Sequence, residues 1–304
     1  MPRPLRTELE FGMTTLPIYL TEADVGRLVT VKDAIAALEE LFARWGQPST
    51  ANLPRQRAPL AGAAFNLMGA AYGAKGVHGL KAYTGVKGGQ FHTLLYSSLD
   101  GRLMAMIEAD LFGQMRTGAA SGIATRLLAN AGARTLGVIG AGKQSRTQIA
   151  AVCAVRPITR VNVFSRTAQQ RETFARSMEK ELGVEVLPAR SAEACVAEAD
   201  VVVTITNSAE PVCRAEWLAA GAHVNVAGAN AKAGEFRELV AAGKLAWSAI
   251  RELGELVTGK ASGRSSPSDL TLFKSLGIAL EDVAFAELVY QRTLAARAGR
   301  PIPI

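Results

Sequence analysis

The stretch Arg134-Thr-Leu-Gly-Val-Ile-Gly-Ala-Gly-Lys-Gln-Ser145 determines how the rest of the sequence is interpreted. Its apolar run, 136–139, ends in Gly140-Ala141-Gly142, and a helix-compatible segment follows over 143–155. A strand, a tight glycine turn and a helix in this order bring backbone N–H groups and a helix N-terminus up to a pyrophosphate. Ser145 replaces the third glycine of the usual fingerprint, and its small side chain still permits close packing of helix on strand. The stretch therefore predicts a dinucleotide-binding turn; the alternative is an ordinary turn of an α/β domain.

The end of the next expected strand, 160–164, indicates which dinucleotide would bind. A fold that binds NAD usually places a carboxylate here to accept from the ribose 2′-hydroxyl. This sequence has Ser165-Arg166-Thr167 instead. Because arginine can pair bidentately with a 2′-phosphate, we expect NADP(H) to be favoured over NAD(H). The alternative is that Arg166 is a solvated loop residue.

Strands and helices continue to alternate after this point. We expect further strands over 184–187, 201–206 and 221–228, and helices over 143–155, 168–182 and 191–197. This alternation predicts a Rossmann-type, doubly wound parallel sheet. Such sheets bind ligands at the carboxyl ends of their strands. Thr206, Asn207, Gly228 and Asn230 are therefore expected beside the glycine turn.

The first third of the sequence has a different pattern. Thr21 and Thr30 are each followed three residues later by aspartate, which is typical of helix starts. Residues 48–54 are expected to form a loop. The expected strands of an antiparallel sheet are 16–20, 63–68, 77–83, 91–97 and 103–108. A helix over 111–129, rich in small residues that allow close packing, should connect this sheet to the parallel one. A closing helix over 279–296 should pack back on the antiparallel sheet.

Composition narrows the classes of protein that need to be considered. The 304 residues are 49% hydrophobic and 20% charged, enough for two domains, each with a core. The net charge of +7 comes from scattered Lys and Arg without interleaved aromatics, so an acidic substrate or phosphorylated cofactor explains it better than nucleic acid. Three distant cysteines and three histidines predict reduced thiols and no metal site. With no signal-like N-terminus and no membrane-length apolar run, we expect a cytoplasmic protein without membrane association.

Several short strings in the chain occur together in one known family. They are Pro54-Arg55-Gln-Arg57, Gly79-Leu-Lys81, Arg116-Thr-Gly-Ala-Ala-Ser121, Gly140-Ala-Gly142, Gly228-Ala-Asn230 and Thr271-Leu-Phe-Lys-Ser-Leu-Gly277. In this order, over roughly residues 15–295, the chain resembles the ornithine cyclodeaminase/mu-crystallin family. The resemblance implies a small amino or imino acid as substrate, a nicotinamide cofactor and a homodimer. It also implies a substrate-binding and dimerisation domain of α+β type over 1–115 with 278–304, and a Rossmann-type dinucleotide-binding domain over 116–277.

The resemblance also implies roles for individual residues. Arg55 or Arg57, together with Arg116, would hold the substrate α-carboxylate, which suits the planar guanidinium. Lys81 would lie against the carboxylate or the reacting C–N centre, where neighbouring cations lower its pKa and suit it to proton transfer. Asn230 is the other expected catalytic residue, and its amide could hydrogen-bond the substrate amine or imine. The residues expected to contact the dinucleotide are Thr117, Gly140, Ala141, Gly142, Lys143, Gln144, Ser165, Arg166, Thr167, Thr206, Asn207 and Gly228.

Alternatives remain for the substrate residues. Lys81 could point to solvent from its strand. Arg116 could be a structural ion-pair residue, with Glu108 or Asp110 as partner. Strand alternation puts Arg55 and Arg57 on the same side, so their roles cannot be separated, and at most one is expected to face the substrate. The three histidines are expected to be structural.

Two departures from the family pattern bear on activity. Several family members carry aspartate at the position of Asn230, and an amide cannot accept a proton at neutral pH. Residues 241–256 also look short, and an edge strand of the sheet could be missing. We therefore expect hydride transfer to or from the α-carbon of a small imino or amino acid, as in a ketimine reductase or amino-acid dehydrogenase. The alternatives are an ammonia-releasing ornithine cyclodeaminase with bound NAD, and a non-catalytic NADPH-binding protein.

Overall fold

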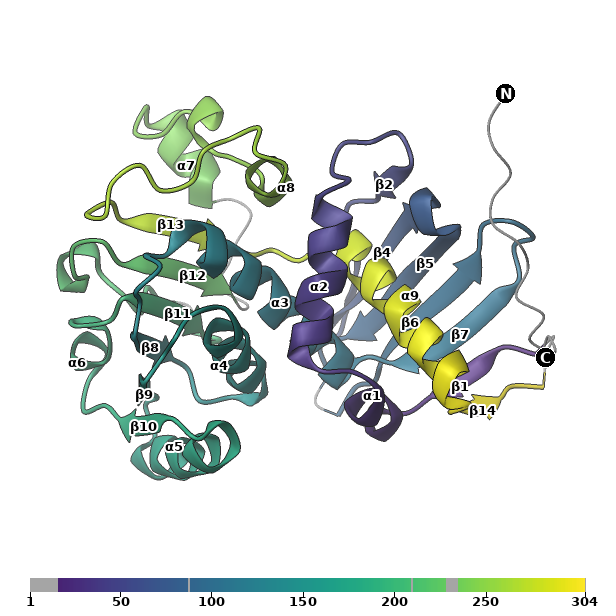
Figure 1. The fold of residues 1–304 in the computed structure, drawn as a ribbon, viewed down its shortest axis with the longest axis horizontal. Helices are drawn as coiled ribbons and strands as arrows, with labels where there is room; N and C mark the ends of the chain where they lie inside the picture. Colours follow the sequence, from purple (N-terminus) through teal and green to yellow (C-terminus); the bar gives the residue numbers. More distant parts are fainter. Residues whose placement is uncertain (1–15, 87, 209, 228–234, 304) are drawn as a thin grey trace.

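The computed structural model describes residues 16–86, 88–208, 210–227 and 235–303. Within these residues the chain forms two β-sheets that lie on either side of a long central helix, α3 (Asp110–Leu128) (Figure 1). Each sheet carries its own layer of helices. In the described part of the chain, no helix is both long enough and apolar enough to cross a membrane.

The first sheet has eight strands in the described residues, in the order β14-β1-β7-β6-β5-β4-β2, with β3 paired to β4. Its strands are β1 (Ile18–Leu20), β2 (Thr50–Asn52), β3 (Gln56–Leu60), β4 (Ala63–Tyr72), β5 (Val77–Thr84), β6 (Phe91–Ser97), β7 (Leu103–Glu108) and β14 (Arg300–Pro301). The pairs are antiparallel as predicted, except that β1 runs parallel to β7. A short 3-10 helix, η1 (Gly73–Lys75), joins β4 to β5.

The prediction of a loop over 48–54 was wrong, because β2 occupies part of it and β3 follows directly. β4 is longer than expected, and its backbone pairs with β2 at one end and with β3 at the other. Every residue of β3 is exposed, so no alternation of buried and exposed positions marked this strand in the sequence. Arg57 lies on β3, and Arg55 precedes it.

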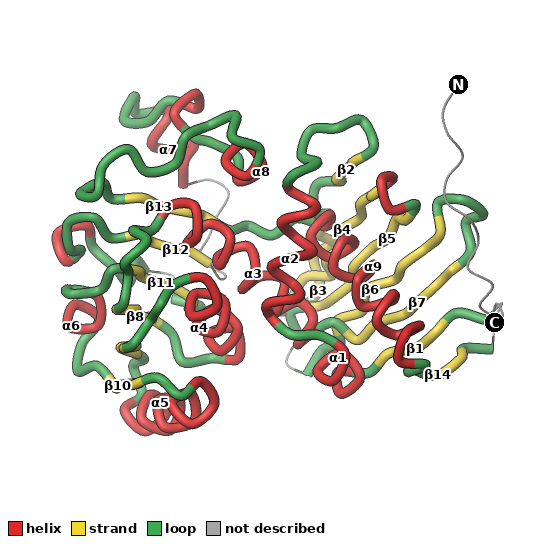
Figure 2. The backbone as a smooth tube through the Cα atoms, viewed as in Figure 1, coloured by secondary structure: helices red, strands yellow, loops and turns green. Residues whose placement is uncertain are grey.

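Helices cover one face of this sheet. They are α1 (Glu22–Leu28) and α9 (Ala279–Ala296), and α2 (Val31–Phe42) packs on α9 and on α3. α9 crosses β4, β5 and β6, so its predicted packing on this sheet is confirmed (Figure 2). Both predicted threonine–aspartate helix starts form reciprocal capping boxes. Along β4 the side chains facing α9, such as Met68, are buried, whereas Phe65 and Leu67 on the opposite face are exposed.

The second sheet has six parallel strands in the described residues, in the order β10-β9-β8-β11-β12-β13. The strands are β8 (Thr135–Ile139), β9 (Arg160–Phe164), β10 (Glu185–Pro188), β11 (Val201–Ile205), β12 (His223–Ala227) and β13 (Thr271–Lys274). The helices that connect β8, β9, β10 and β11 are α4 (Lys143–Val155), α5 (Ala168–Leu182) and α6 (Ala192–Val196). This is the predicted doubly wound α/β sheet, and the strand order reverses between β8 and β11.

The segment between the last two strands of this sheet is made of short helices. In its described residues it contains α7 (Glu235–Ala241), η3 (Trp247–Ala249) and α8 (Leu253–Val257) and no strand. Another 3-10 helix, η2 (Ala215–Trp217), precedes β12. The edge of the sheet is formed by β13, which pairs directly with β12.

The central helix α3 packs closely on both halves. Gly118 lies against α4, where a Cβ atom would come within 2.5 Å of the Thr147 carbonyl oxygen, so the predicted close approach of this small-residue helix to a backbone is confirmed. On the other side, the rings of Phe112 and Phe285 stack with centroids 4.8 Å apart, a contact worth about 0.5–1.5 kcal/mol beyond its buried area. α3 therefore fixes the position of one sheet relative to the other.

Candidate active site

A cavity of about 960 Å³ lies between the two sheets and is lined by residues of both. The predicted site residues that line it are Arg55, Arg57, Lys81, Arg116, Thr117, Gly140, Ala141, Gly142, Lys143, Gln144, Ser165, Arg166, Thr167, Thr206 and Asn207. Gly228 and Asn230 lie outside the described residues. The structure thus brings together every predicted site residue that it describes.

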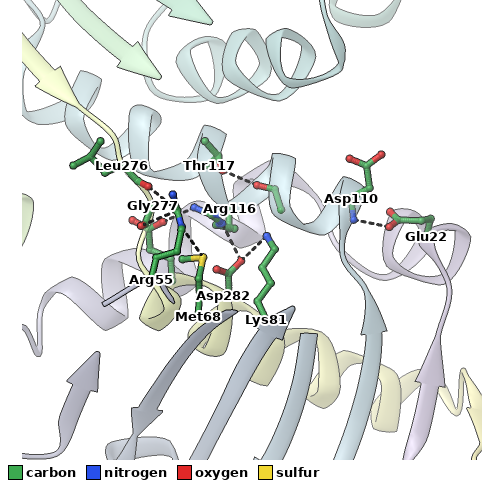
Figure 3. Close-up of polar contacts among 12 residues, drawn as sticks. Glu22, Arg55, Met68, Lys81, Asp110, Arg116, Thr117, Leu276, Gly277 and Asp282 are labelled. Atoms are coloured by element: carbon green, nitrogen blue, oxygen red, sulfur yellow. Dashed lines mark hydrogen bonds and ion pairs between the residues drawn. The ribbon is translucent and has the colours of Figure 1, made fainter. Parts of the chain in front are cut away.

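Lys81 is buried and does not point to solvent. Its Nζ lies 3.1 Å from Oδ1 of Asp282, with 5% and 1% of the two side chains exposed (Figure 3). A Cβ atom on Gly113 would come within 2.7 Å of this Nζ, so glycine at that position makes room for the ammonium group. The rings of Tyr83 and Phe91 lie 5.8 and 5.9 Å from it.

Arg116 joins the same cluster from the second turn of α3. Its Nε donates to Oδ1 of Asp282 at 3.0 Å and its Nη1 to Oε2 of Glu281 at 2.9 Å. The alternative ion-pair partners considered from the sequence, Glu108 and Asp110, were wrong. Gly277 lies against the guanidinium with φ +68°, where a Cβ atom would come within 2.7 Å of Nη1.

Burial and the neighbouring opposite charges shift the pKa values of these side chains in opposite directions. Burial lowers the pKa of Lys81, Asp282 raises it and the positive charge of Arg116 lowers it further, so the net direction is down. Burial also disfavours the charge on Arg116, but Asp282 and Glu281 outweigh it and raise its pKa. Burial raises the pKa of Glu281. Lys81 therefore releases its proton more readily than an ordinary lysine, which suits it to proton transfer.

Arg55 and Arg57 approach the cavity from the start of the β3 region. Nη2 of Arg55 donates to the Leu276 carbonyl oxygen at 2.9 Å, and its Nε contacts Sδ of Met68 at 3.3 Å. Nε of Arg57 donates to Oδ1 of Asn66 at 3.2 Å. The expectation that at most one of the two faces the substrate remains a prediction, since both line the cavity.

The start of α3 is held by a carboxylate from α1. Glu22 accepts from the backbone N–H of Asp110 at 2.6 Å and of Leu111 at 2.7 Å, two donors that have no partner within their own helix. Figure 3 shows this contact beside the Lys81 cluster. Because Arg116 lies less than two turns further on, Glu22 fixes the helix that carries it.

The glycine turn has the geometry of a dinucleotide cradle. Gly140 has φ +129°, and a Cβ atom there would come within 2.1 Å of the Ile205 carbonyl oxygen, so only glycine fits. A Cβ atom on Gly142 would meet open space inside the cavity. Ser145 donates from Oγ to the Gly140 carbonyl oxygen at 2.9 Å and accepts from the Gly142 N–H at 3.2 Å, which explains how serine replaces the third glycine. The N-terminus of α4 then faces the same space.

The end of β9 offers a cation but no carboxylate. Ser165 is half-buried, Arg166 is exposed, and both line the cavity. In the described residues Arg166 has no ion-pair partner, and Oγ of Ser165 donates to the Thr167 carbonyl oxygen at 3.1 Å. A phosphate group would find a guanidinium and two hydroxyls here.

Sequence reasoning missed the acidic members of the cluster. Glu281 and Asp282 lie in the first turn of α9, where carboxylates are common, so nothing local distinguishes them from capping residues. The sequence offered one signal: Glu281 and Asp282 are flanked in the helix by apolar residues, which indicates that this part of the helix is buried. Two adjacent carboxylates that are both buried require cationic partners. Lys81 and Arg116, which the sequence had already placed in the site, could have been proposed as these cationic partners.

The sequence pattern of the ornithine cyclodeaminase/mu-crystallin family matches this chain over residues 17–241 and 241–297. The chain belongs to this family. Membership confirms the predicted resemblance. The two matched segments meet at residue 241, the start of the stretch that looked short in the sequence.

Relatives of known name agree with the family assignment. A Delta(1)-pyrroline-2-carboxylate reductase of Bacillus cereus is 33% identical over 230 residues, which cover 66% of this chain and 70% of that protein. The structure of the Thermococcus litoralis Delta(1)-pyrroline-2-carboxylate reductase, in complex with NADH and L-proline, has a TM-score of 0.89 at 27% identity, covering 94% of this chain and all of that one. An archaeal alanine dehydrogenase dimer with bound NAD has a TM-score of 0.85 at 26% identity, covering 95% and 99%.

Proposed function

We propose that this member of the family is an NAD(P)(H)-dependent oxidoreductase that interconverts a small imino acid and the corresponding amino acid. The observation that carries the proposal is the cavity itself. One end holds the glycine turn and the N-terminus of α4, and the other holds Lys81 and three guanidinium groups. A nicotinamide cofactor and an amino or imino acid would therefore share one space.

The nicotinamide, when bound, supplies or accepts the hydride at the α-carbon. Residues of the chain bind the substrate carboxylate and transfer the proton. Arg55 or Arg57, together with Arg116, binds the α-carboxylate and so fixes the α-carbon. In the reductive direction Lys81 gives a proton to the imine nitrogen as the C=N bond becomes C–N; in the oxidative direction it takes the proton back. A water molecule ordered by the same cluster is the alternative proton donor.

We further propose that NADP(H) is preferred over NAD(H). Arg166 supports this, because it is the cation at the end of β9 where a carboxylate would favour the unphosphorylated ribose. Replacing it with aspartate should invert the preference. The measurement is kcat/KM for NADPH and NADH in the wild type and in Arg166→Asp, with Arg176→Asp as control, since Arg176 is an exposed residue of α5 that does not line the cavity.

We also propose that the protein is a homodimer. The outer face of the first sheet, opposite α9, exposes Phe65 and Leu67, with Leu80 and Leu94 half-buried on neighbouring strands. A second copy packing on this face would cover it. On this proposal, residues 1–115 with 278–304 form the substrate and dimerisation domain, and 116–277 form the dinucleotide domain. Light scattering of Leu67→Glu should show a smaller mass than the wild type.

The proposed activity is tested by following NADPH and NADH oxidation with keto acids plus methylamine and with preformed pyrroline-2-carboxylate. Turnover that is lost in Lys81→Met, while the variant still binds the dinucleotide, supports the proposal. Ammonia and proline from ornithine without change in cofactor absorbance would instead indicate a cyclodeaminase. Dinucleotide binding without turnover in either assay would indicate a binding protein.

A further inference from the structure

Four side chains that line the cavity form one row across the first sheet. Arg57 on β3 lies opposite Asn66 on β4. Asn66 in turn lies opposite Tyr83 on β5, and Tyr83 lies opposite Phe91 on β6. Residues directly opposite each other in a ladder project their side chains from the same face of the sheet. The row therefore changes along its length, from a guanidinium and an amide at one end to two aromatic rings at the other.

The two rings stack on each other beside Lys81. Their centroids are 5.0 Å apart, with an angle of 14° between the planes. Lys81 and Tyr83 are two residues apart on β5, so their side chains share a face. Nζ of Lys81 lies 5.8 Å from the centroid of Tyr83 and 5.9 Å from that of Phe91. Both aromatic side chains are half-buried and line the cavity, so they form its wall next to the position of the substrate nitrogen.

Arg55 lies on the opposite side of Lys81 from Phe91. Lys81 is opposite Met68 of β4, and Sδ of Met68 contacts Nε of Arg55. Phe91 belongs to β6, which flanks β5 on its other side. Figure 3 shows Arg55 and Met68 together on one side of the Lys81 ammonium group. A substrate with its carboxylate on the arginine side and its nitrogen beside Lys81 therefore directs its side chain over the two rings.

The other residues at the aromatic end add small side chains and no free carboxylate. Ala109, whose N–H donates to the Phe91 carbonyl oxygen at 2.8 Å, lines this end together with Gly113. Among the described residues that line the cavity, the carboxylate is that of Asp110, and it is paired with Lys143 at 2.8 Å. An ammonium group on a substrate side chain would have to compete with Lys143 for it. An aromatic ring can instead stack on the two rings in the offset arrangement that such rings prefer.

We propose that the substrate is an α-imino acid with an aromatic side chain, and that this side chain stacks on Tyr83 and Phe91. This inference rests on the proposed imine-reducing function. An arylpyruvate and methylamine form an imine with loss of water. Hydride from NADPH adds to its α-carbon and a proton to its nitrogen, so the products are the N-methyl aromatic amino acid and NADP⁺. The aromatic ring takes no part in these bond changes and serves to orient the α-carbon.

The test compares keto acids that differ in their side chain, each supplied with methylamine and NADPH. Phenylpyruvate is compared with pyruvate, and also with 3-cyclohexylpyruvate, which has the same number of carbon atoms but a puckered ring. We expect kcat/KM to be highest for phenylpyruvate. In Phe91→Leu and in Tyr83→Leu the ratio of phenylpyruvate to pyruvate kcat/KM should fall roughly tenfold, as expected for lost stacking and lost apolar contact.

Tyr96→Leu is the matched control. In the described residues Tyr96 and His78 form a second stacked pair between β5 and β6, with centroids 5.5 Å apart, and neither lines the cavity. The variant loses the same kind of contact between the same two strands, yet its ratio of phenylpyruvate to pyruvate kcat/KM should match the wild type. Urea unfolding of the three variants shows that a changed ratio reflects binding and not loss of the fold.

Each outcome decides between the two proposals. Turnover of the pyruvate imine or of preformed pyrroline-2-carboxylate with no preference for phenylpyruvate overturns this inference and leaves the reductase intact. Equal kcat/KM for phenylpyruvate and 3-cyclohexylpyruvate also overturns it, as does an aromatic preference that survives in both Phe91→Leu and Tyr83→Leu. No turnover of any imine, with NADPH still bound, overturns the proposed function and this inference with it.

Discussion

Replacing Asp282 with asparagine should move the pH dependence of the reaction to lower pH. The substitution keeps the shape of the side chain and removes the charge beside Lys81. Asp282 is a group that raises the pKa of Lys81, whereas burial and Arg116 lower it. Without the carboxylate, Lys81 should lose its proton at a lower pH than in the wild type. Imine reduction needs the protonated amine, so its alkaline limb should move down.

The structure sets the size of this effect. Two unit charges 3.1 Å apart interact by about 5 kcal/mol at an effective dielectric constant near 20. That figure is an upper bound, because the amide oxygen of asparagine still accepts a hydrogen bond and its surroundings relax. One pKa unit corresponds to about 1.4 kcal/mol, so we expect a shift of one unit or more. Removing one partner of a buried ion pair also lowers stability, by about 3 kcal/mol where Lys81 can respond by losing its proton.

The assay is kcat/KM for imine reduction and for amino-acid oxidation as a function of pH. In Asp282→Asn the alkaline limb of reduction and the acid limb of oxidation should move down together, since both report the same lysine. Glu281→Gln is the matched control, because Glu281 pairs with Arg116 and not with Lys81. It should lower stability with a smaller shift of either limb. Unchanged limbs in folded Asp282→Asn would refute the assignment of Lys81 as the titrating group.

Four further substitutions test the residues that shape the site. Gly140→Ala forces a Cβ atom against the Ile205 carbonyl oxygen at φ +129°, so the free energy of unfolding in urea should fall by about 1–3 kcal/mol. Gly142→Ala, whose Cβ atom meets open space, should keep its stability and lose dinucleotide affinity in a fluorescence titration. Equal stabilities of the two variants would contradict the turn geometry. Gly277→Ala should displace the Arg116 guanidinium and raise KM for the imino acid, and an unchanged KM would argue against that contact. Glu22→Ala removes two hydrogen bonds from the start of α3 and should cost about 1–2 kcal/mol in urea unfolding; a neutral result would mean that water replaces the cap.

Sequence reasoning recovered the parallel sheet well because its signals are local. The glycine turn, the apolar strands and the helix α4 each follow from a few adjacent residues. The bounds of α4, α5 and α9 agree with the expected ranges. The short strands β2 and β3 could not be predicted, because they owe their existence to pairing with β4 and carry no burial pattern of their own.

The candidate site was predictable in its cations and not in its anions. Lys81 and Arg116 belong to recognisable strings of sequence. Asp282 lies 201 positions after Lys81, and only the packing of α9 on the first sheet brings the two together. Long-range ion pairs of this kind depend on the tertiary fold, so local sequence cannot specify them.

The measurement that tests the central claim most directly is the fate of the hydride. The protein would be incubated with an imino acid and with coenzyme carrying deuterium at the reactive carbon of the nicotinamide. The amino acid formed would then be analysed by mass spectrometry. Direct transfer to the α-carbon predicts one deuterium at that carbon in the wild type and no labelled product in Lys81→Met. An unlabelled amino acid formed by the wild type would contradict the account.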